Sequence, residues 1–222
     1  MSGVRLNVGA GAATVPGWLN LDASPTLLVT KLLPSPLLGA LAAILPVSRR
    51  GALQAYARER AHLVWGDARR GLPLADGAAD AVYSSHFLEH VRRTDALRFL
   101  RECHRVLRPG GVLRIVVPDL RRLARQYLEG EGGRRLTADE FLSATMLAEP
   151  ERPRLVARAL STFFDRASHL WMYDVASLSA LLCEAGFPEP REHAFREGLA
   201  PDLEQLDLAE RASESIYLEA AR

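Results

Sequence analysis

LNVGAGAATVPGWLNLD, residues 6–22, contains two strand-like runs that each end at a residue useful for ligand binding. The first run, 4–8, alternates apolar and polar residues and stops at Gly9-Ala10-Gly11, where the small side chains let the backbone approach a ligand closely. The second run, 18–21, ends at Asp22, a carboxylate suited to binding the two hydroxyls of a ribose. The segment therefore predicts a nucleoside-binding site.

The short connection between these two runs indicates which kind of nucleotide fits. A dinucleotide fingerprint needs a helix after its glycines and an acidic residue about twenty positions further on. Here Asp22 follows Gly11 by eleven residues, and Pro16-Gly17 marks a turn, so one or two helical turns fit at most. Without a helix to hold a pyrophosphate, we expect a nucleoside that lacks one, and S-adenosylmethionine meets that description.

Composition is typical of a soluble globular protein. The chain has 222 residues, of which 48% are hydrophobic and 25% charged, and we expect one domain over residues 1–222. A formal net charge of +1 provides no field to attract nucleic acid or an anionic membrane. Cys103 and Cys183 lie among apolar residues at helical spacing, so we expect buried, reduced thiols. From the reduced thiols and the absence of a leader pattern in the first residues, we expect a cytoplasmic location.

Two segments resemble insertions. The apolar run 32–47 is interrupted by three prolines and is shorter than the roughly 20 residues that a membrane span requires. We expect it to belong to a buried or lid-forming helical insertion at about 27–60; a surface-lying amphipathic segment that meets a lipid-linked substrate is the alternative. A second insertion is expected at about 130–170, after a glycine-rich break. Both suit a pocket that encloses a small molecule.

Strands and helices alternate through the first 118 residues. The expected helices are 37–60, divided by Pro46, then 94–107, capped by Thr94 and stopped by 108–111, followed later by 120–129 and 175–185. The expected strands are 4–8, 18–21, 62–65, 80–84, 112–117, 191–195 and 215–220. This order predicts a parallel sheet with helices on both faces, and ligands then bind beyond the carboxyl ends of the strands.

Five motifs in order carry a resemblance to a known family: VGAG (8–11), NLD (20–22), GDAR (66–69), LEHV (88–91) and LRPGGVLRIVVPDL (107–120). Together they resemble the class I S-adenosylmethionine-dependent methyltransferases, in particular the small single-domain, type 11-like enzymes. The resemblance covers about 4–120 and, more loosely, the closing strands to 220. It implies a Rossmann-like, doubly wound α/β fold, with a mostly parallel seven-stranded sheet, an antiparallel last strand beside the fifth, and here a shortened first helix.

The resemblance also implies a cofactor-binding set. The glycine turn would pass beneath the methionine part of the cofactor, the first aspartate would hold the ribose, and the second would accept from the adenine amino group beside a main-chain N–H. Two residues after the fourth strand would face the sulfonium. In that order the residues are Gly9, Ala10, Gly11, Asp22, Asp67, Ala68, Ser85 and His86. Either aspartate by itself is also typical of a turn cap after a strand.

Two histidines are the candidate catalytic residues. Methyl transfer mainly needs alignment of the acceptor, with a base when the acceptor must lose a proton. His86 and His90 follow the strand 80–84, and neutral imidazole accepts a proton near pH 7. Phe87 follows His86, so the HExxH signature is absent and we expect no metal. A structural role for Glu89 and His90, as a helix cap or in stabilising the loop, is the alternative.

The cluster 169–174 (HLWMYD) mixes aromatic and ionisable groups before a helix. We expect His169, Trp171 and Tyr173 to close over the acceptor; a hydrophobic staple with Asp174 as N-cap is the alternative. The neutral charge and the lack of an Asn/Asp-Pro-Pro-Tyr signature disfavour nucleic acid, which leaves a small molecule, a sugar or a natural-product scaffold. The rival interpretation is an S-adenosylmethionine-binding protein without methyl transfer activity, acting as a regulatory partner or in a non-methyl reaction.

Overall fold

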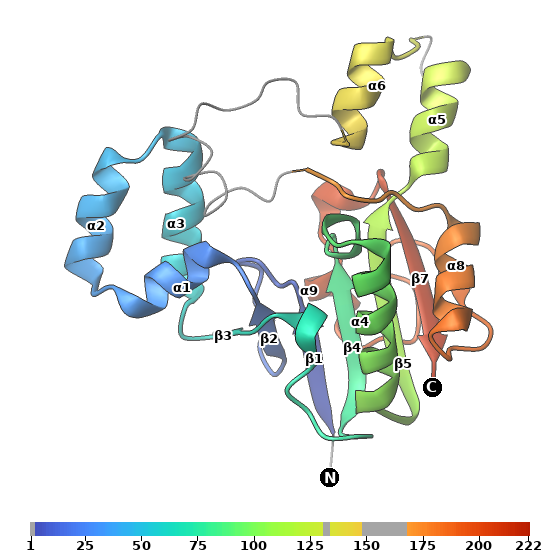
Figure 1. The fold of residues 1–222 in the computed structure, drawn as a ribbon, viewed down its shortest axis with the longest axis horizontal. Helices are drawn as coiled ribbons and strands as arrows, with labels where there is room; N and C mark the ends of the chain where they lie inside the picture. The colour runs from blue at the N-terminus through green and yellow to red at the C-terminus, as the bar shows by residue number, and fades with distance from the viewer. Residues whose placement is uncertain (1–2, 131–133, 148–167) are drawn as a thin grey trace.

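The computed structural model describes residues 3–130, 134–147 and 168–222. Within them the chain forms a seven-stranded sheet in the order β3-β2-β1-β4-β5-β7-β6 (Figure 1). The strands are β1 (Val4–Val8), β2 (Leu19–Asp22), β3 (Leu63–Trp65), β4 (Ala79–Ser85), β5 (Leu107–Pro118), β6 (Arg191–His193) and β7 (Ser215–Ala221).

The direction of the strands confirms the Rossmann-like, doubly wound fold. The strands from β3 to β5 pair in parallel, and β7 runs antiparallel to both β5 and β6. After β1 the chain builds outward through β2 and β3, and then returns to place β4 on the other side of β1. The strand order therefore reverses between β1 and β4, the place where such sheets bind ligands.

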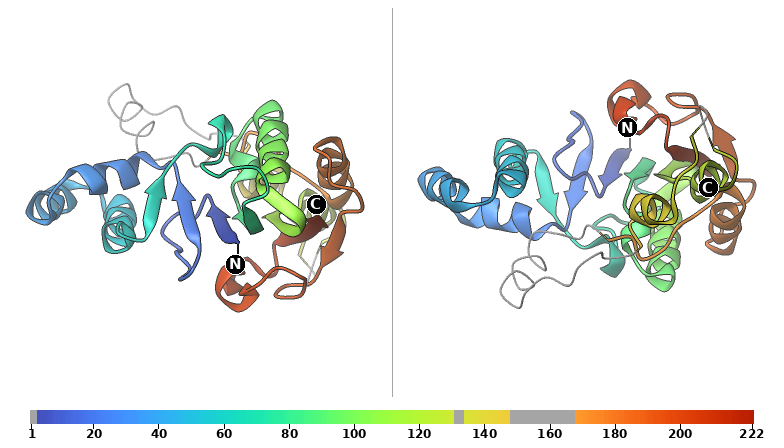
Figure 2. Two further views of the ribbon diagram at one scale, coloured as in Figure 1. Left: turned by 90° about the horizontal axis from the view of Figure 1, so that it is seen from below. Right: turned by 90° about the horizontal axis from the view of Figure 1, so that it is seen from above.

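Helices lie on both faces of this sheet, beyond its β3 edge and beyond the carboxyl ends of its strands (Figure 1). They are α1 (Pro25–Leu32), α2 (Ser35–Ile44), α3 (Val47–Glu59), α4 (Arg93–Val106), α5 (Leu120–Leu128), α6 (Ala138–Thr145), α8 (Val175–Glu184) and α9 (Leu203–Leu206), with 3-10 turns η1 (Ala68–Arg70), η2 (Leu88–His90) and η3 (Ala209–Arg211). Helices α4 and α8 lie on one face of the sheet and α9 on the other (Figure 2). Helix α5 follows β5 directly, so it stands beyond the carboxyl end of that strand (Figure 1).

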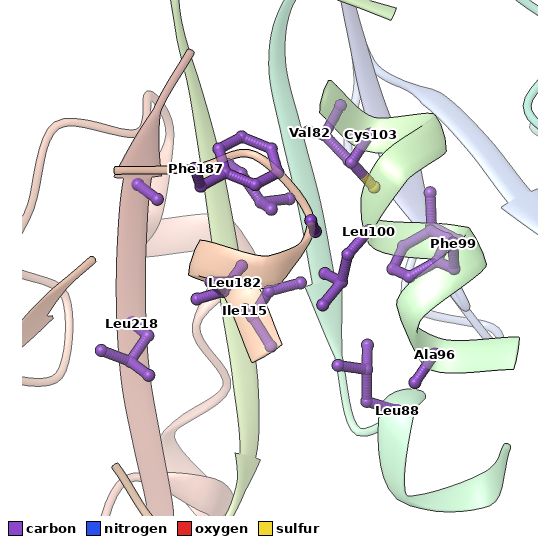
Figure 3. Packing of buried hydrophobic residues seen from close by; sticks show 14 of the residues in the cluster. Val82, Leu88, Ala96, Phe99, Leu100, Cys103, Ile115, Leu182, Phe187 and Leu218 are labelled. Atoms are coloured by element: carbon purple, nitrogen blue, oxygen red, sulfur yellow. The ribbon is translucent and has the colours of Figure 1, made fainter. Parts of the chain in front are cut away.

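The larger part of the core lies between α4, α8 and the sheet. Phe99, Leu100 and Cys103 recur at helical spacing on α4 and are fully buried. Figure 3 shows this face of α4 turned toward Val82 of β4 and Ile115 of β5. The packing explains why the central strands are rich in β-branched residues, since both of their faces are covered.

The connection between β1 and β2 is a loop that Asn20 holds in place. Residues 9–18, all of which the structure describes, form turns and no helix. The Asn20 carboxamide accepts the N–H of Val15 at 3.0 Å and donates to its carbonyl at 3.1 Å, and Asn7 donates to the same amide oxygen at 3.0 Å. This buried side chain takes up main-chain hydrogen bonds that a helix would satisfy internally. The first helix, which we expected to be shortened, is therefore absent between β1 and β2.

Segment 25–60 forms three helices beyond the β3 edge of the sheet (Figures 1 and 2), and the first of them, α1, was not predicted. One side of this unit is packed, because Leu38 and Ala42 of α2 contact Leu53 of α3. The other side is open to solvent, and Ile44 and Val47 are each 81% exposed. The expectation of a buried insertion therefore holds for one face only. Among the described residues, no helix is both long and apolar enough to cross a membrane.

Two local expectations are wrong. Cys183 is exposed, because Leu178, Leu181 and Leu182 form the buried face of α8 and the next residue turns away from it, whereas Cys103 is buried as expected. Thr94 does not cap α4: the chain is extended at Arg92, so the helix begins one residue before Thr94. The helix does end before residues 108–111, as expected, and these residues belong to β5.

A fully buried arginine joins several segments of the chain through hydrogen bonds on the face of the sheet that α9 covers. Arg114 of β5 donates to Asp207 at 2.6 Å and to Glu219 of β7 at 2.9 Å, and both carboxylates are buried. The same guanidinium donates to the carbonyl of Glu197 at 2.9 Å. Because Asp207 directly follows α9, the network holds the segment 194–207 against β5 and β7.

Candidate functional site

A cavity of about 280 Å³ lies at the carboxyl ends of β1, β2 and β4, at the point where the strand order reverses. Its walls are mostly apolar and include Val8, Leu21 and Ala68. Polar groups converge on it from several elements, as in most small-molecule sites. The predicted site residues among those lining it are Gly9, Asp22, Ala68, His86 and His90.

Asp22 is the acidic group of this cavity, and the main chain fixes its orientation. The side chain is 8% exposed. One carboxylate oxygen accepts the N–H of Gly11 at 2.9 Å, and the other accepts the N–H of Ser24 at 2.7 Å. Both donors lie in the loops that flank β2, so the carboxylate is held in place by the same turns that shape the cavity.

Tyr56 of α3 is a site residue that the sequence did not reveal. Its hydroxyl donates to Asp22 at 3.1 Å, and the residue lines the cavity. Burial and the nearby Asp22 carboxylate raise the pKa of Tyr56, so the phenol stays protonated and remains a donor. A lone tyrosine 34 positions after Asp22 carries no recognisable pattern; only the packing of α3 brings the two together.

The glycine turn has a packing requirement as well as a ligand-binding one. Gly9 has φ of +69°, and a Cβ at this position would lie 2.9 Å from Cβ of Phe87. The N–H groups of Gly9 and Ala10 both donate to the carbonyl of Leu21. Gly11 also has a positive φ, and its N–H holds Asp22. The turn thus couples β1, β2 and the residue that follows His86.

Replacing Gly9 by alanine is expected to destabilise the protein by about 1–3 kcal/mol, because the residue would combine a left-handed backbone with a clash against Phe87. Urea denaturation measures the difference. Gly51→Ala in α3 is the matched control: nothing lies within 4 Å of its added Cβ, and alanine is expected to raise helix stability by about 1 kcal/mol. Equal effects of the two substitutions would contradict the packing role of Gly9.

Asp67 has a structural role in addition to the one predicted for it. Its side chain caps η1 by accepting the N–H of Arg69 at 3.1 Å, and it binds the Arg69 guanidinium through both oxygens, at 2.7 and 2.6 Å. Ala68 lines the cavity, whereas Asp67 is not among the residues that do. A role for Asp67 in binding adenine stays a prediction.

His86 stands at the end of β4 in a left-handed conformation, with φ of +51°. Its main-chain N–H donates to Val116 O, which keeps it tied to β5. The ring contacts two groups: Nδ1 lies 3.1 Å from a carboxyl oxygen of Glu89, and Nε2 lies 2.9 Å from the hydroxyl of Ser215. A residue that is not glycine in this conformation is uncommon and typical of functional sites.

A second cavity, of about 690 Å³, adjoins the first. His86 and His90 line both cavities, and His169 lines the second one. Helices α5 and α6 form its far wall through residues such as Leu123 and Ala144. Of the second insertion, expected at about 130–170, residues 131–133 and 148–167 lie outside the described residues, and the described part contributes to this cavity through α6. The two catalytic candidates lie at the boundary between the pockets.

His90 and His169 are brought side by side, with ring centroids 5.0 Å apart. Nδ1 of His169 lies 2.8 Å from the carbonyl of Thr145, and Nδ1 of His90 lies 3.3 Å from the carbonyl of Ser168. A carbonyl only accepts, so each Nδ1 carries its proton. Burial, as the largest cause, lowers the pKa of His169, and this ring is neutral near pH 7.

Three other predicted residues lie elsewhere. Trp171 is half exposed, and the guanidinium of Arg93 stands 5.7 Å from its ring. Tyr173 is buried in the main core, and Ser85 lines neither of the two cavities. Asp174 forms a capping box with Ser177 at the start of α8, which confirms the N-cap alternative for that residue. Of the three acceptor candidates, only His169 lines either of these cavities, and it lines the second one.

Comparison with known proteins gives a family match. Residues 6–115 match a family model described as a methyltransferase domain. A protein of Mycolicibacterium smegmatis described as a probable S-adenosylmethionine-dependent methyltransferase is 44% identical over 48 residues, which span 22% of this chain and 18% of that protein.

Solved structures with a similar arrangement include two methyltransferases that use S-adenosylmethionine. The protein from Thermotoga maritima has a TM-score of 0.48 at 16% identity, with 100% of this chain and 83% of that chain covered. The protein from Mesorhizobium loti has a TM-score of 0.47 at 20% identity, with 100% and 91% covered.

Proposed function

The chain belongs, through residues 6–115, to the methyltransferase domain family, and we propose that it transfers the methyl group of S-adenosylmethionine to a small-molecule, sugar or natural-product acceptor. The observation that carries this proposal is the pair of adjoining cavities that share His86 and His90. The first cavity would hold the cofactor and the second the acceptor, so that the two reactants meet at the histidines.

The residues of the first cavity fit S-adenosylmethionine. Its apolar walls suit the adenine and the methionine carbon chain, while Asp22 offers the ribose hydroxyls a carboxylate that Gly11 and Ser24 already orient. Tyr56 supports the same carboxylate from α3. When bound, the cofactor supplies a methyl carbon that its sulfonium has already activated for displacement.

The chain itself aligns the acceptor and removes its proton. The walls of the second cavity position the acceptor atom, and such alignment is the larger part of catalysis for an in-line displacement. Nδ1 of His90 donates to the carbonyl of Ser168, so Nε2 keeps the lone pair that a general base needs. His86 faces both cavities and is the second candidate for this role.

The proposal is tested in two steps. Calorimetry of the full chain with S-adenosylmethionine measures cofactor binding, and release of S-adenosylhomocysteine is then measured with a panel of sugars and other small metabolites. Binding together with turnover of one class supports the proposal. Tight binding without turnover across a broad panel favours the rival, a cofactor-binding protein that does not transfer methyl groups. Absence of binding contradicts both.

His90→Ala is expected to lower turnover about 100-fold or more while it changes the dissociation constant of the cofactor little, because a positioned base contributes to the chemical step. Steady-state kinetics and calorimetry on the same preparation separate the two effects. The exposed His62 supplies the control, since His62→Ala removes an imidazole outside both cavities. Similar losses of turnover and affinity in His90→Ala would instead assign His90 a structural role.

A further inference from the structure

Glu89 carries a buried carboxyl group, and its contacts within the protein do not compensate the cost of burying it. The residue is fully buried in η2, and neither of its carboxyl oxygens accepts a hydrogen bond of good geometry. In the part of the chain that the structure describes, its one ion-pair contact is Nδ1 of His86, at 3.1 Å. Burying a carboxyl group costs several kcal/mol unless hydrogen bonds or a cation compensate it. The position therefore needs a positive partner.

Two imidazoles stand beside this carboxyl group. A carboxyl oxygen of Glu89, a ring nitrogen of His90 and a ring nitrogen of His169 all lie within 4.8 Å of one another. Since Nδ1 of each histidine donates to a main-chain carbonyl, Nε2 is the nitrogen that keeps a lone pair. Metal-ligating histidines in proteins are usually fixed in this way, with the other ring nitrogen donating to a carbonyl or carboxylate.

The main chain holds the three residues together. The carbonyl of Glu89 accepts the N–H groups of Leu170 at 2.7 Å and Trp171 at 3.2 Å, and the N–H of His169 donates to the carbonyl of Met146. These bonds place the segment 169–171 alongside η2, although it lies some eighty residues further along the sequence. The cluster is therefore built by the backbone and does not depend on flexible side chains alone.

We propose that Glu89, His90 and His169 bind a divalent transition-metal ion, for which Zn²⁺ is the best probe. Two imidazoles and one carboxylate are the protein ligands of an open zinc site, which leaves a coordination position for water or substrate. Ligand atoms around a tetrahedral zinc are about 3.3 Å apart. The three ligand atoms here lie within 4.8 Å of one another, so small side-chain rotations bring them to the spacing that zinc requires.

The site faces the second cavity, because His90 and His169 both line it. Binding of the ion does not depend on methyl transfer; its role does rest on the proposed function. There the ion would hold an oxygen of the acceptor and lower the pKa of that hydroxyl, which favours its deprotonation. His90 would then act as a ligand, and His86 would be the histidine left to accept the proton.

Calorimetry of the chelator-treated full chain with Zn²⁺, in the absence of cofactor and acceptor, tests the site directly. We expect one ion per chain, and a Co²⁺-loaded sample should show the visible absorption of a low-coordinate site. Glu89→Gln keeps the shape of the side chain and should weaken Zn²⁺ binding about 100-fold or more, as should His169→Ala, because each removes a ligand. His62→Ala should bind as the wild type does.

Three results would overturn the proposal: no Zn²⁺ binding by the wild type, equal binding by Glu89→Gln, or loss of binding in His62→Ala. If His169→Ala does not fold, the Glu89→Gln variant still decides the question. Retained S-adenosylmethionine binding and turnover without Zn²⁺ would refute the role of the ion in methyl transfer and leave the proposed function intact. Zn²⁺ binding without any S-adenosylmethionine binding would refute the proposed function and leave the metal site intact.

Discussion

Asp22→Ala is expected to weaken S-adenosylmethionine binding about 100-fold, which makes it the largest single effect on the cofactor cavity. A hydrogen bond to a charged group is worth about 1.5–3 kcal/mol, and a ribose offers the carboxylate two hydroxyls. The substitution also releases the N–H groups of Gly11 and Ser24, which shape the loops on either side of β2. Calorimetry of the purified variant measures the change.

Tyr56→Phe is the matched control for Asp22. It removes the hydroxyl that donates to the same carboxylate and leaves the ring, Asp22 and both main-chain donors in place. The expected loss of affinity is about tenfold or less, the value of one hydrogen bond. If Asp22→Ala binds the cofactor as tightly as Tyr56→Phe does, Asp22 caps a turn and does not hold the ribose.

Arg114→Leu is expected to lower the free energy of unfolding by about 3–5 kcal/mol, since it leaves Asp207 and Glu219 buried without their cation. The loss would be a large share of the roughly 5–15 kcal/mol that stabilises a domain of ordinary size. Urea denaturation followed by circular dichroism measures it. The segment 194–207, which this network holds against the sheet, should become sensitive to protease first.

Arg108→Leu provides the comparison on the same strand. Arg108 is an exposed arginine of β5 that pairs with Asp80 at the surface, so its loss should leave the unfolding free energy close to that of the wild type. A change of less than about 1 kcal/mol in Arg114→Leu would show that the buried network contributes little net stability, as happens when desolvation offsets the ion pairs.

Much of the fold followed from local patterns. The run 112–117 predicted a strand covered on both faces, and β5 is an inner strand of the sheet, between β4 and β7. The spacing from Gly11 to Asp22 predicted a connection with little helix, and the structure has none there. The errors lie where local pattern is weak: Cys183 directly follows the buried Leu181 and Leu182 of α8, and α1 begins at Pro25, before the apolar run 32–47.

The site residues also divide into those that local patterns predicted and those that only the packing of distant elements brings to the cavities. Gly9, Asp22, His86 and His90 follow strands, and since parallel strands end at the same edge, their proximity is a consequence of the predicted sheet. Tyr56 and His169 reach the cavities from helices and loops far away in the sequence, and no spacing rule relates them to Asp22 or His90. Glu89 was visible in the LEHV motif, but its burial was not.

The sequence by itself determined the alternation of strands and helices that builds the parallel sheet, the near absence of a helix after the first strand, and the aspartate at the end of β2. These features depend on residues close together along the chain, where period, turn chemistry and length act directly. Only the tertiary structure decided that Tyr56 donates to Asp22, that Trp171 lies at the surface, and that His169 stands beside His90. Such contacts depend on how whole elements pack, because the free energy of burying surfaces far apart in sequence decides which side chains meet.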